Sequence, residues 1–591
     1  MTHIPHLKGQ QIYALIVLLG FTFILFQSID PAIICFIQES VPDRFMDGFH
    51  HIGGINDVMA MHIISLFNFK EAGFVVLLTM VGLFFLSLQT LFGKLRRHPY
   101  FLVGIFTIAL SLLFPLFEYT FSFTLTSSIV FSTWMIVLGF FISYKISQLK
   151  WLPVSAILLL NYFLFGVPGF YLSCIIAIIH HSTPKYQKLL FALLAIAIPA
   201  LSLITGMNYT FQQAYSEPFV PTIYHKVKAA AYAIYVLTPL VIILLRATEK
   251  RMDRQTLGKG KKVLHRVLQY GIPVLLSVAV FHFSYDIAKK EIYQIEVYAQ
   301  QKNWQGVLKN ARHFQYFNSK LLHFQTNRAL YHQGILLDHL FQYPQPSGIE
   351  GLFLDNNTDG SIAQPKADFY FEMGYGNESR HFANEALITR GNRPHTLKCL
   401  IINYAAAGQF VIATKYWNLL NQSIAHKKWA KDHAGLLQGE IDNDIQRLKG
   451  NFPEHDFFTG LARPENKLKR FFISNPQNKM AFEYLVANYL ITHKVGNVAN
   501  EIPTFKRLGY TRLPRLVEEA MLLYLELTHD TEFDFQGYQI SKEALQDFKD
   551  FSLAVQKAGG KAKAKNAVQA YNHTFWYYIM YNSPLSRTEK Q

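Results

Sequence analysis

The sequence predicts an all-α protein in which a polytopic membrane helical bundle of about nine segments precedes a soluble α-helical-repeat domain. Charged residues form 16% of the 591 residues, whereas soluble domains contain about 25%. Apolar runs of about 20 residues, the length that crosses a bilayer, recur as far as residue 285. Beyond that point apolar residues recur at helical spacing, and the alternation typical of strands is scarce.

The membrane-spanning helices are expected in residues 1–285. They lie near residues 11–28, 72–92, 100–117, 122–143, 188–205, 226–246 and 267–285. Residues 151–180 are also apolar, but the GVPG sequence at 166–169 interrupts them. Because glycine and proline break helices, this stretch predicts two short helices that form a hairpin. Counting both halves gives nine segments, and the sequence leaves open whether the hairpin spans the bilayer.

The orientation follows from the basic loops, which contribute to a formal net charge of +16. Four of them fall on one side of the predicted bundle: residues 93–99, 144–150, 180–188 and 246–266. Basic loops tend to stay in the cytoplasm, so the N-terminus is expected there. The long first loop, residues 28–71, and everything after residue 285 are expected on the other side. The basic charge is explained as a topology signal, so no nucleic-acid partner is expected.

Residues 286–591 are expected to form a separate soluble domain of helix pairs. Residues 291–314 and 319–345 each predict two helices separated by a turn. Gly374 and Gly408 are 34 residues apart, which is the repeat length of tetratricopeptide (TPR) helix pairs. The full TPR consensus is absent. The sequence therefore predicts an irregular TPR-like solenoid, a form that presents a concave face to proteins or ligands.

Two further stretches complete this domain. Residues 481–502 predict another, degenerate helix pair. The aromatic sequence HTFWYYIMY at 573–581 is expected to pack as the last helix of the solenoid, and the alternative is that it rests on the membrane interface.

Candidate chemistry lies in the first loop, where residues 43–59 read DRFMDGFHHIGGINDVM. Carboxylates can act as general bases, so Asp43, Asp47 and Asp57 are candidate catalytic residues. Carboxylate oxygens and an imidazole nitrogen can also bind a divalent cation, which makes Asp43, Asp47 and His50 a candidate metal set.

An interfacial helix is the competing explanation of this loop. If residues 39–51 are helical, Glu39 and the carboxylates that follow share one face, which would point to water while Phe45 and Phe49 point to lipid. The Gly53–Gly54 pair predicts a backbone turn, or a place where another segment approaches the backbone closely.

The remaining motifs identify no cofactor. The sequence DNNTDG at 355–360 matches the start of an EF-hand calcium loop, but Lys366 stands where a bidentate glutamate is needed. An Asx-rich turn is expected there instead. The three cysteines lack a zinc spacing, and the glycine motifs that bind phosphate are absent. The sequence leaves the cofactor unknown.

Seven stretches carry a family resemblance: GGINDVMAMHIISLFNFKEAG (53–73), NRALYHQGILLDHLFQYPQ (327–345), FANEALITRG (382–391), AAGQFVIATKYWNLL (406–420), MAFEYLVANYL (480–490), LPRLVEEAMLLY (513–524) and TFWYYIMY (574–581). They resemble an uncharacterised family of polytopic membrane proteins from Bacteroidota. The patterns contain no catalytic signature, so the resemblance implies no site residue. It does imply a Gram-negative inner membrane, which would make residues 286–591 a periplasmic domain.

Two functions remain open. One is a scaffold or partner-binding protein of cell-envelope biogenesis, in which the helices anchor a periplasmic domain that recruits envelope proteins. The other is a membrane glycosyltransferase that uses a polyprenyl-phosphate-linked sugar, with first-loop carboxylates as base or metal ligands. Its support is a shared architecture, which does not establish function. A transporter is disfavoured because few charged residues lie within the apolar segments. The sequence identifies neither substrate, partner nor oligomeric state.

Overall fold

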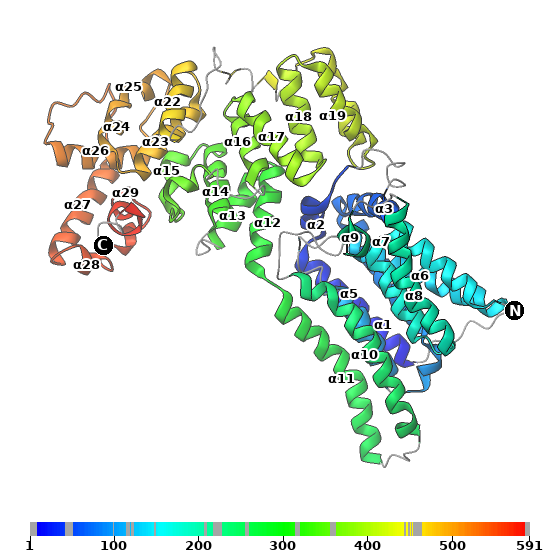
Figure 1. Cartoon of the computed structure of the whole chain (residues 1–591). Helices are drawn as coiled ribbons and strands as arrows, with labels where there is room; N and C mark the ends of the chain where they lie inside the picture. Colours follow the sequence, from blue (N-terminus) through cyan, green and yellow to red (C-terminus); the bar gives the residue numbers. More distant parts are fainter. Residues whose placement is uncertain are drawn as a thin grey trace. The chain divides into compact units, whose positions relative to one another are not determined.

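The computed structural model shows a helical chain that divides into two compact units (Figure 1). It describes residues 9–41, 51–98, 100–113, 119, 123–146, 149–205, 210–216, 227–253, 259–313, 319–354, 362–441, 445–446, 450, 452 and 464–585. Every regular element in these residues is a helix, which confirms the predicted all-α class. Unit 1 contains Met1–Asp286 and Gln422–Lys427, and unit 2 contains Ile287–Asn421 and Lys428–Gln591.

Unit 1 is built mainly from long apolar helices. They are α1 (Gly9–Ile29), α2 (Pro31–Gln38), α3 (Gly54–Ser65), α4 (Lys70–Leu91), α5 (Phe101–Leu113), α6 (Phe123–Lys145), α7 (Trp151–Ile179), α8 (Lys185–Ile204), α9 (Phe211–Ser216), α10 (Val227–Asp253) and α11 (Lys259–Ser284). Of the helices described, six are long and apolar enough to span a membrane, namely α4, α6, α7, α8, α10 and α11. Helices α1 and α2 together, bent by 63°, would make a seventh span. These helices match most of the predicted apolar runs and indicate a membrane protein, but they are fewer than the nine predicted segments. The run predicted at 100–117 appears in the described residues as α5, which is shorter than a span.

Helix α7 reverses its direction at Gly166. This residue has a φ of +78° and a ψ of −177°, outside the helical region. Asn161 Nδ2 donates to Ser173 Oγ at 2.8 Å, although the two residues are 12 positions apart. In a straight helix they would be separated by about 18 Å. Both side chains also bond to the carbonyl oxygen of Ser132, so the predicted hairpin is confirmed.

The reversal changes how α7 can sit in a membrane. Its halves, residues 151–165 and 167–179, are each about 20 Å long at a rise of 1.5 Å per residue. The hydrocarbon core of a bilayer is about 30 Å thick. Although α7 has the 29 residues of a span, each of its halves is shorter than the thickness of the hydrocarbon core. Helices α4, α6, α8, α10 and α11 are the continuous candidates for spans.

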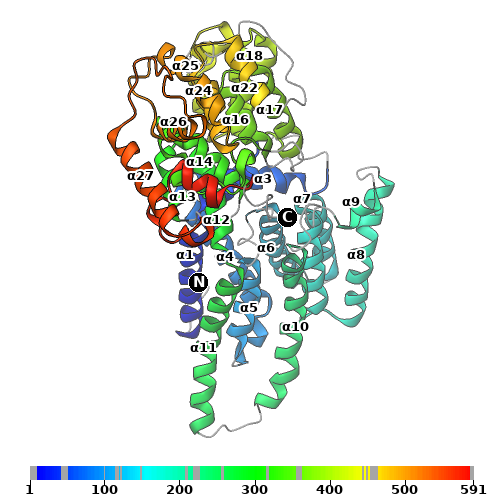
Figure 2. The same cartoon turned by 90° about the vertical axis from the view of Figure 1, so that its left-hand side faces the viewer.

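Helix α6 packs against both halves of the hairpin, and α8 lies beside them (Figure 1 and Figure 2). Gly139 of α6 packs on Ile157 in the first half. Gly169 in the second half lies so close to Ser128 and Ser132 of α6 that any Cβ there would clash with the Ser132 hydroxyl. Small residues at such crossings allow close approach of the helices, which explains the tight fit of the hairpin.

Unit 2 is a succession of shorter helices. They are α12 (Ile287–Gln300), α13 (Trp304–His313), α14 (Lys320–His332), α15 (Leu336–His339), α16 (Ala363–Glu372), α17 (Gly376–Arg390), α18 (Pro394–Ala406), α19 (Phe410–Gln422), α20 (Lys427–Asp432), α22 (Pro464–Ser474), α23 (Lys479–Ile491), α24 (Val495–Asn500), α25 (Ile502–Arg507), α26 (Arg515–Thr528), α27 (Lys542–Lys557), α28 (Lys561–Ala564) and α29 (Phe575–Tyr577). Successive pairs contact one another, for example α13 with α14 and α17 with α18.

Five helix pairs of unit 2 close through the same turn: α12/α13, α14/α15, α16/α17, α18/α19 and α23/α24. One residue of each turn has a positive φ, in chain order Lys302, Gly334, Gly374, Gly408 and His493. The next N–H donates at 2.8–2.9 Å to the carbonyl five positions back: Asn303 to Tyr298, Ile335 to Leu330, Tyr375 to Tyr370, Gln409 to Tyr404 and Lys494 to Tyr489. This Schellman pattern satisfies a carbonyl at the end of the first helix. The predicted helix pairs are thus confirmed.

The aromatic sequence near the C-terminus packs inside unit 2. Phe575, Trp576, Tyr577 and Tyr578 are each at most 3% exposed. The indole N–H of Trp576 donates to the carbonyl oxygen of Glu519 at 2.8 Å, which satisfies the one polar atom of that ring. The predicted packing of this segment is therefore confirmed.

Candidate functional site

Most of the predicted first-loop site lies outside the described residues. This holds for Asp43, Asp47 and His50, and therefore for the whole candidate metal set. Asp57 is described and lies in the first turn of α3, with its Oδ2 3.3 Å from His51 Nε2. Both side chains are partly exposed, so this pair can meet solvent or a ligand.

Glu39 is the buried carboxylate at the start of the same loop. It follows the last residue of α2 with an extended backbone, so the helix considered over residues 39–51 does not begin there. Its Oε1 accepts from Asn68 Nδ2 at 3.2 Å and lies 3.1 Å from Nε2 of His426, in the Gln422–Lys427 segment of unit 1. Cys35 Sγ donates to Oε2 at 3.4 Å. The Glu39 carboxylate is thus held on both oxygens.

Gly53 fixes this loop to the hairpin of α7. Its N–H donates to the carbonyl oxygen of Phe163 at 3.0 Å, and its φ is +76°. A Cβ at this position would lie 3.0 Å from the Cα of Gly166. Gly54 N–H also donates to the carbonyl oxygen of His51 at 3.2 Å. Both explanations of the glycine pair therefore hold: it forms a turn, and another backbone approaches it closely.

The contacts of Gly53 belong to a wider set that caps the hairpin tip. A helix leaves its last carbonyls without intrahelical partners. At the tip, the Phe163 carbonyl receives Gly53 N–H and the Phe165 carbonyl receives Ser128 Oγ–H. Asn56 of α3 donates to the carbonyl oxygen of Thr124. The described end of the first loop, with Asp57, is thereby held against the folded end of the hairpin.

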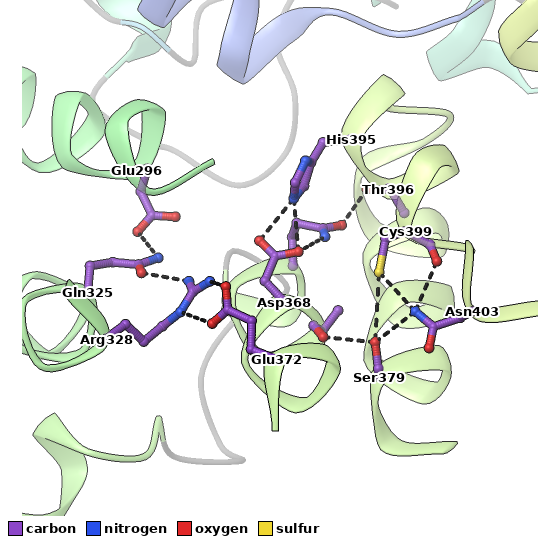
Figure 3. Close-up of polar contacts among 12 residues, drawn as sticks. Glu296, Gln325, Arg328, Asp368, Glu372, Ser379, His395, Thr396, Cys399 and Asn403 are labelled. Atoms are coloured by element: carbon purple, nitrogen blue, oxygen red, sulfur yellow. Dashed lines mark hydrogen bonds and ion pairs between the residues drawn. The ribbon is translucent and has the colours of Figure 1, made fainter. Parts of the chain in front are cut away.

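Unit 2 contains a buried ionic network between α12, α14 and α16 (Figure 3). Arg328 donates from Nη2 and Nε to the two oxygens of Glu372 at 2.9 and 3.1 Å. Gln325 accepts from Arg328 Nη1 at 2.7 Å and donates to Glu296 at 2.8 Å. The Arg328 side chain is only 2% exposed. One chain of polar contacts thus ties the first helices of three successive pairs.

The pKa values of two carboxylates in this network are shifted in opposite directions, that of Glu372 downward and that of Glu296 upward. Burial alone would raise the pKa of Glu372, but the charges of Arg328 and His332 outweigh it and hold that pKa well below its usual range. Burial raises the pKa of Glu296 to about 7, and the hydrogen bond from Gln325 offsets only part of this rise. Glu372 is therefore a permanent anion, whereas Glu296 titrates near neutral pH.

A second pair, less buried than the network, joins α16 to α18. His395 Nε2 lies 2.9 Å from both carboxylate oxygens of Asp368, and Figure 3 shows Asp368 between Glu372 and His395. Gln364 donates to Asp368 at 2.8 Å and accepts from Thr396. The side chains of Asp368 and His395 are 18% and 27% exposed, so this pair can reach a ligand.

The neighbouring Ser379, Cys399 and Asn403 do not form a nucleophilic site. Asn403 Nδ2 donates to Ser379 Oγ, and Ser379 Oγ donates to the carbonyl oxygen of Ala367. Burial raises the pKa of the Cys399 thiol to about 12, so the reactive thiolate is scarce at neutral pH. These side chains serve to join α16, α17 and α18.

The site in unit 2 was not predicted from the sequence. Arg328 could have been predicted as a site residue, because it is a charged residue among apolar positions of α14, close to Phe324 and Leu330. Asp368 and His395 gave no signal, since their pairing depends on the packing of two helices. The DNNTDG sequence at 355–360 lies outside the described residues. Within the part described, no group of three or more His, Cys, Asp or Glu side chains is placed to hold a metal ion.

Comparison with known proteins gives one result. No curated protein and no solved structure matches the chain. The model of a family of unknown function (DUF6057) matches residues 10–582, and the chain belongs to that family.

Proposed function

We propose that this chain is an inner-membrane protein whose unit 2 is a periplasmic TPR-like domain that binds envelope proteins, as a scaffold of cell-envelope biogenesis. The observation that carries the proposal is the turn shared by five helix pairs. Stacked helix pairs of this kind present extended surfaces for binding other proteins. The orientation rests on the basic loops of unit 1.

The Asp368–His395 pair is the suggested contact point. Both residues lie on first helices of successive pairs, α16 and α18, as Arg328 and Glu296 do on α14 and α12. Asp368 and His395 lie close to the buried Arg328–Glu372 pair (Figure 3), but of these charges they are the more exposed. A partner segment that carries Lys, Arg or amide groups would complement Asp368 there.

Photo-cross-linking in living cells tests this proposal. A photoreactive residue replaces His395 in one strain and Ile388 in another. Ile388 is the matched control, because it is 85% exposed but lies on a second helix, α17. We expect an adduct with an envelope protein from position 395 and none from position 388. Equal adducts from both positions, or none from position 395 at normal protein level, would refute the proposed surface.

A polyprenyl-phosphate-dependent glycosyltransferase is the second candidate. The observation that favours it is the docking of the first loop on the hairpin tip through Gly53, which holds a carboxylate-bearing loop against the α7 hairpin. Asp43, Asp47 and Asp57 would then act as base or metal ligands. Each is replaced singly by Asn, and the envelope glycans and lipid-linked sugars of each strain are compared with those of a deletion strain. If the deletion strain has an unchanged profile, this candidate fails.

A further inference from the structure

A large cavity opens at the end of unit 1 where the two arms of the α7 hairpin end. Its volume is about 1050 Å³, at the upper limit of ligand pockets, which measure about 300–1,000 Å³. Trp151 at the start of the hairpin and His180 just after it both line the cavity. Residues from α4, α6 and the start of α8 complete its wall. The cavity therefore exists because the hairpin returns to the side from which it entered.

The polar end of this cavity carries positive charge without a counter-ion. Lys94 and Lys150 line it, and the described lining contains no carboxylate. In the part of the chain that is described, neither lysine forms an ion pair. Arg246 adds a further charge close enough to act on His180 and His181, and its Nη2 is buried without a hydrogen-bond partner. Two lysines thus line a space whose described lining offers them no anion, and Arg246 adds positive charge nearby, where Glu249 acts on it.

The two histidines form a neutral part of the wall. Burial, together with the nearby cations, lowers the pKa of His180 to about 3 and that of His181 to about 4. The His180 ring lies 3.9 Å from the ring of Phe140, between centroids. The imidazoles therefore stay uncharged at neutral pH, and the positive charge of the cavity comes from the lysines and the arginine.

The other wall of the cavity is apolar and faces outward. Trp134, Leu138 and Phe141 of α6 line it and are 51%, 38% and 55% exposed. In a membrane helix such side chains face hydrocarbon. The cavity therefore combines a cationic end with an apolar slot, which complements an amphiphile that has an anionic head and a hydrocarbon chain.

We propose that this cavity binds an anionic phospholipid, with the phosphate at Lys94 and Lys150 and an acyl chain against Trp134 and Phe141. Charge complementarity selects this occupant, because a neutral lipid would bring no anion to the two lysines and a zwitterionic lipid would bring its own cation beside them. The site is separate from the partner surface of unit 2 and from the first-loop carboxylates. It holds whichever of the two functions above is correct.

Tryptophan quenching tests the proposal on the full chain in detergent micelles. Trp134 and Trp151 are the two tryptophans of residues 1–286, and both line the cavity. Phosphatidic acid with brominated acyl chains is titrated against the protein, and brominated phosphatidylcholine is titrated in parallel. We expect saturable quenching by phosphatidic acid at low concentration. Equal quenching by phosphatidylcholine would overturn the assignment of an anionic lipid.

Two double variants locate the site. Lys94→Gln/Lys150→Gln removes the two lining charges, whereas Lys185→Gln/Lys188→Gln removes two charges of α8 that do not line the cavity. A lysine near a phosphate contributes roughly five-fold in affinity, so we expect the first variant to bind phosphatidic acid about 30-fold more weakly. The second variant should bind within two-fold of wild type. Equal losses of affinity in both double variants would indicate non-specific attraction of the lipid to basic residues and would overturn the site.

Inorganic phosphate distinguishes the lipid from a soluble anion. Added at millimolar concentration, it should leave the quenching by brominated phosphatidic acid unchanged, because the acyl chain supplies much of the binding free energy. Complete displacement by inorganic phosphate would assign the cavity to a soluble anion and overturn the lipid proposal.

Discussion

Gly53 of the first loop and Gly166 at the fold of the α7 hairpin bring their backbones together so closely that a Cβ on Gly53 would lie 3.0 Å from the Gly166 Cα. Both residues have positive φ values, +76° and +78°. Two glycines that are far apart in the chain thus share one contact, which joins the described end of the first loop to the α7 hairpin.

Gly53→Ala should destabilise unit 1. An alanine there combines a left-handed backbone, which disfavours a side chain by about 1–2 kcal/mol, with a Cβ too close to Gly166. Thermal unfolding is followed with a dye that reacts with the buried thiols Cys35 and Cys174, in a Cys399→Ser background. Gly82→Ala is the control, because a Cβ on Gly82 meets no atom within 4 Å. Equal melting temperatures for the two variants would contradict the contact.

Gly169→Ala should separate the hairpin from α6. The added methyl group would overlap the Ser132 hydroxyl and the Ser128 carbonyl oxygen, so we expect a loss of about 1–3 kcal/mol, as in overpacked cores. Adding Ser132→Gly should recover part of the loss, because it removes one of the two clashes. The same thiol-reactivity measurement applies. If Gly169→Ala alone is as stable as wild type, the hairpin does not pack as described.

Arg328→Met should be far more damaging than loss of an exposed arginine. It leaves the buried carboxylate of Glu372 without its guanidinium partner, and breaking a buried pair costs about 3–5 kcal/mol. Arg512→Met is the matched control, because Arg512 bonds to Asp338 with 68% of its side chain exposed. Exposed pairs contribute about 0–1 kcal/mol. Hydrogen exchange of the backbone amides of α14 and α16 measures the loss of stability in each variant. Equal protection of these amides in the two variants would refute a stabilising network.

Glu296→Gln should change the pH dependence of unit 2. The folded-state pKa of Glu296 is raised to about 7, above that of an unfolded glutamate, so the folded state binds the extra proton. The contribution of Glu296 is favourable at acidic pH and is lost as the pH rises through about 7. The neutral amide resembles the protonated acid, so the variant should match wild type near pH 5 and exceed its stability near pH 8.

Denaturant unfolding at several pH values measures this difference. Glu526→Gln provides the control, since Glu526 is exposed on α26. Comparing each variant with wild type at the same pH removes the contributions of other titrating groups, such as His323, whose pKa is lowered by burial. A pH-independent difference between Glu296→Gln and wild type would contradict a raised pKa.

The sequence predicted features that depend on neighbours in the chain. The break of α7 was visible because GVPG interrupts an apolar run, and the turns at Gly334, Gly374 and Gly408 were visible because glycine ends helices. Such signals act over a few residues. The partner of Arg328 gave no such signal, because Glu372 lies 44 positions later on another helix pair. The close approach of another backbone to Gly53 also became evident only from the position of Gly166.

By itself the sequence determined the helical class, the apolar helices and the succession of helix pairs, because length, composition and spacing act locally along the chain. Only the tertiary structure decided that Gly53 meets Gly166, that Arg328 pairs with Glu372 and that Asp368 pairs with His395. The physical reason is that these contacts join residues distant in sequence. Their formation depends on which helix faces pack together, and that is fixed only when the chain has folded.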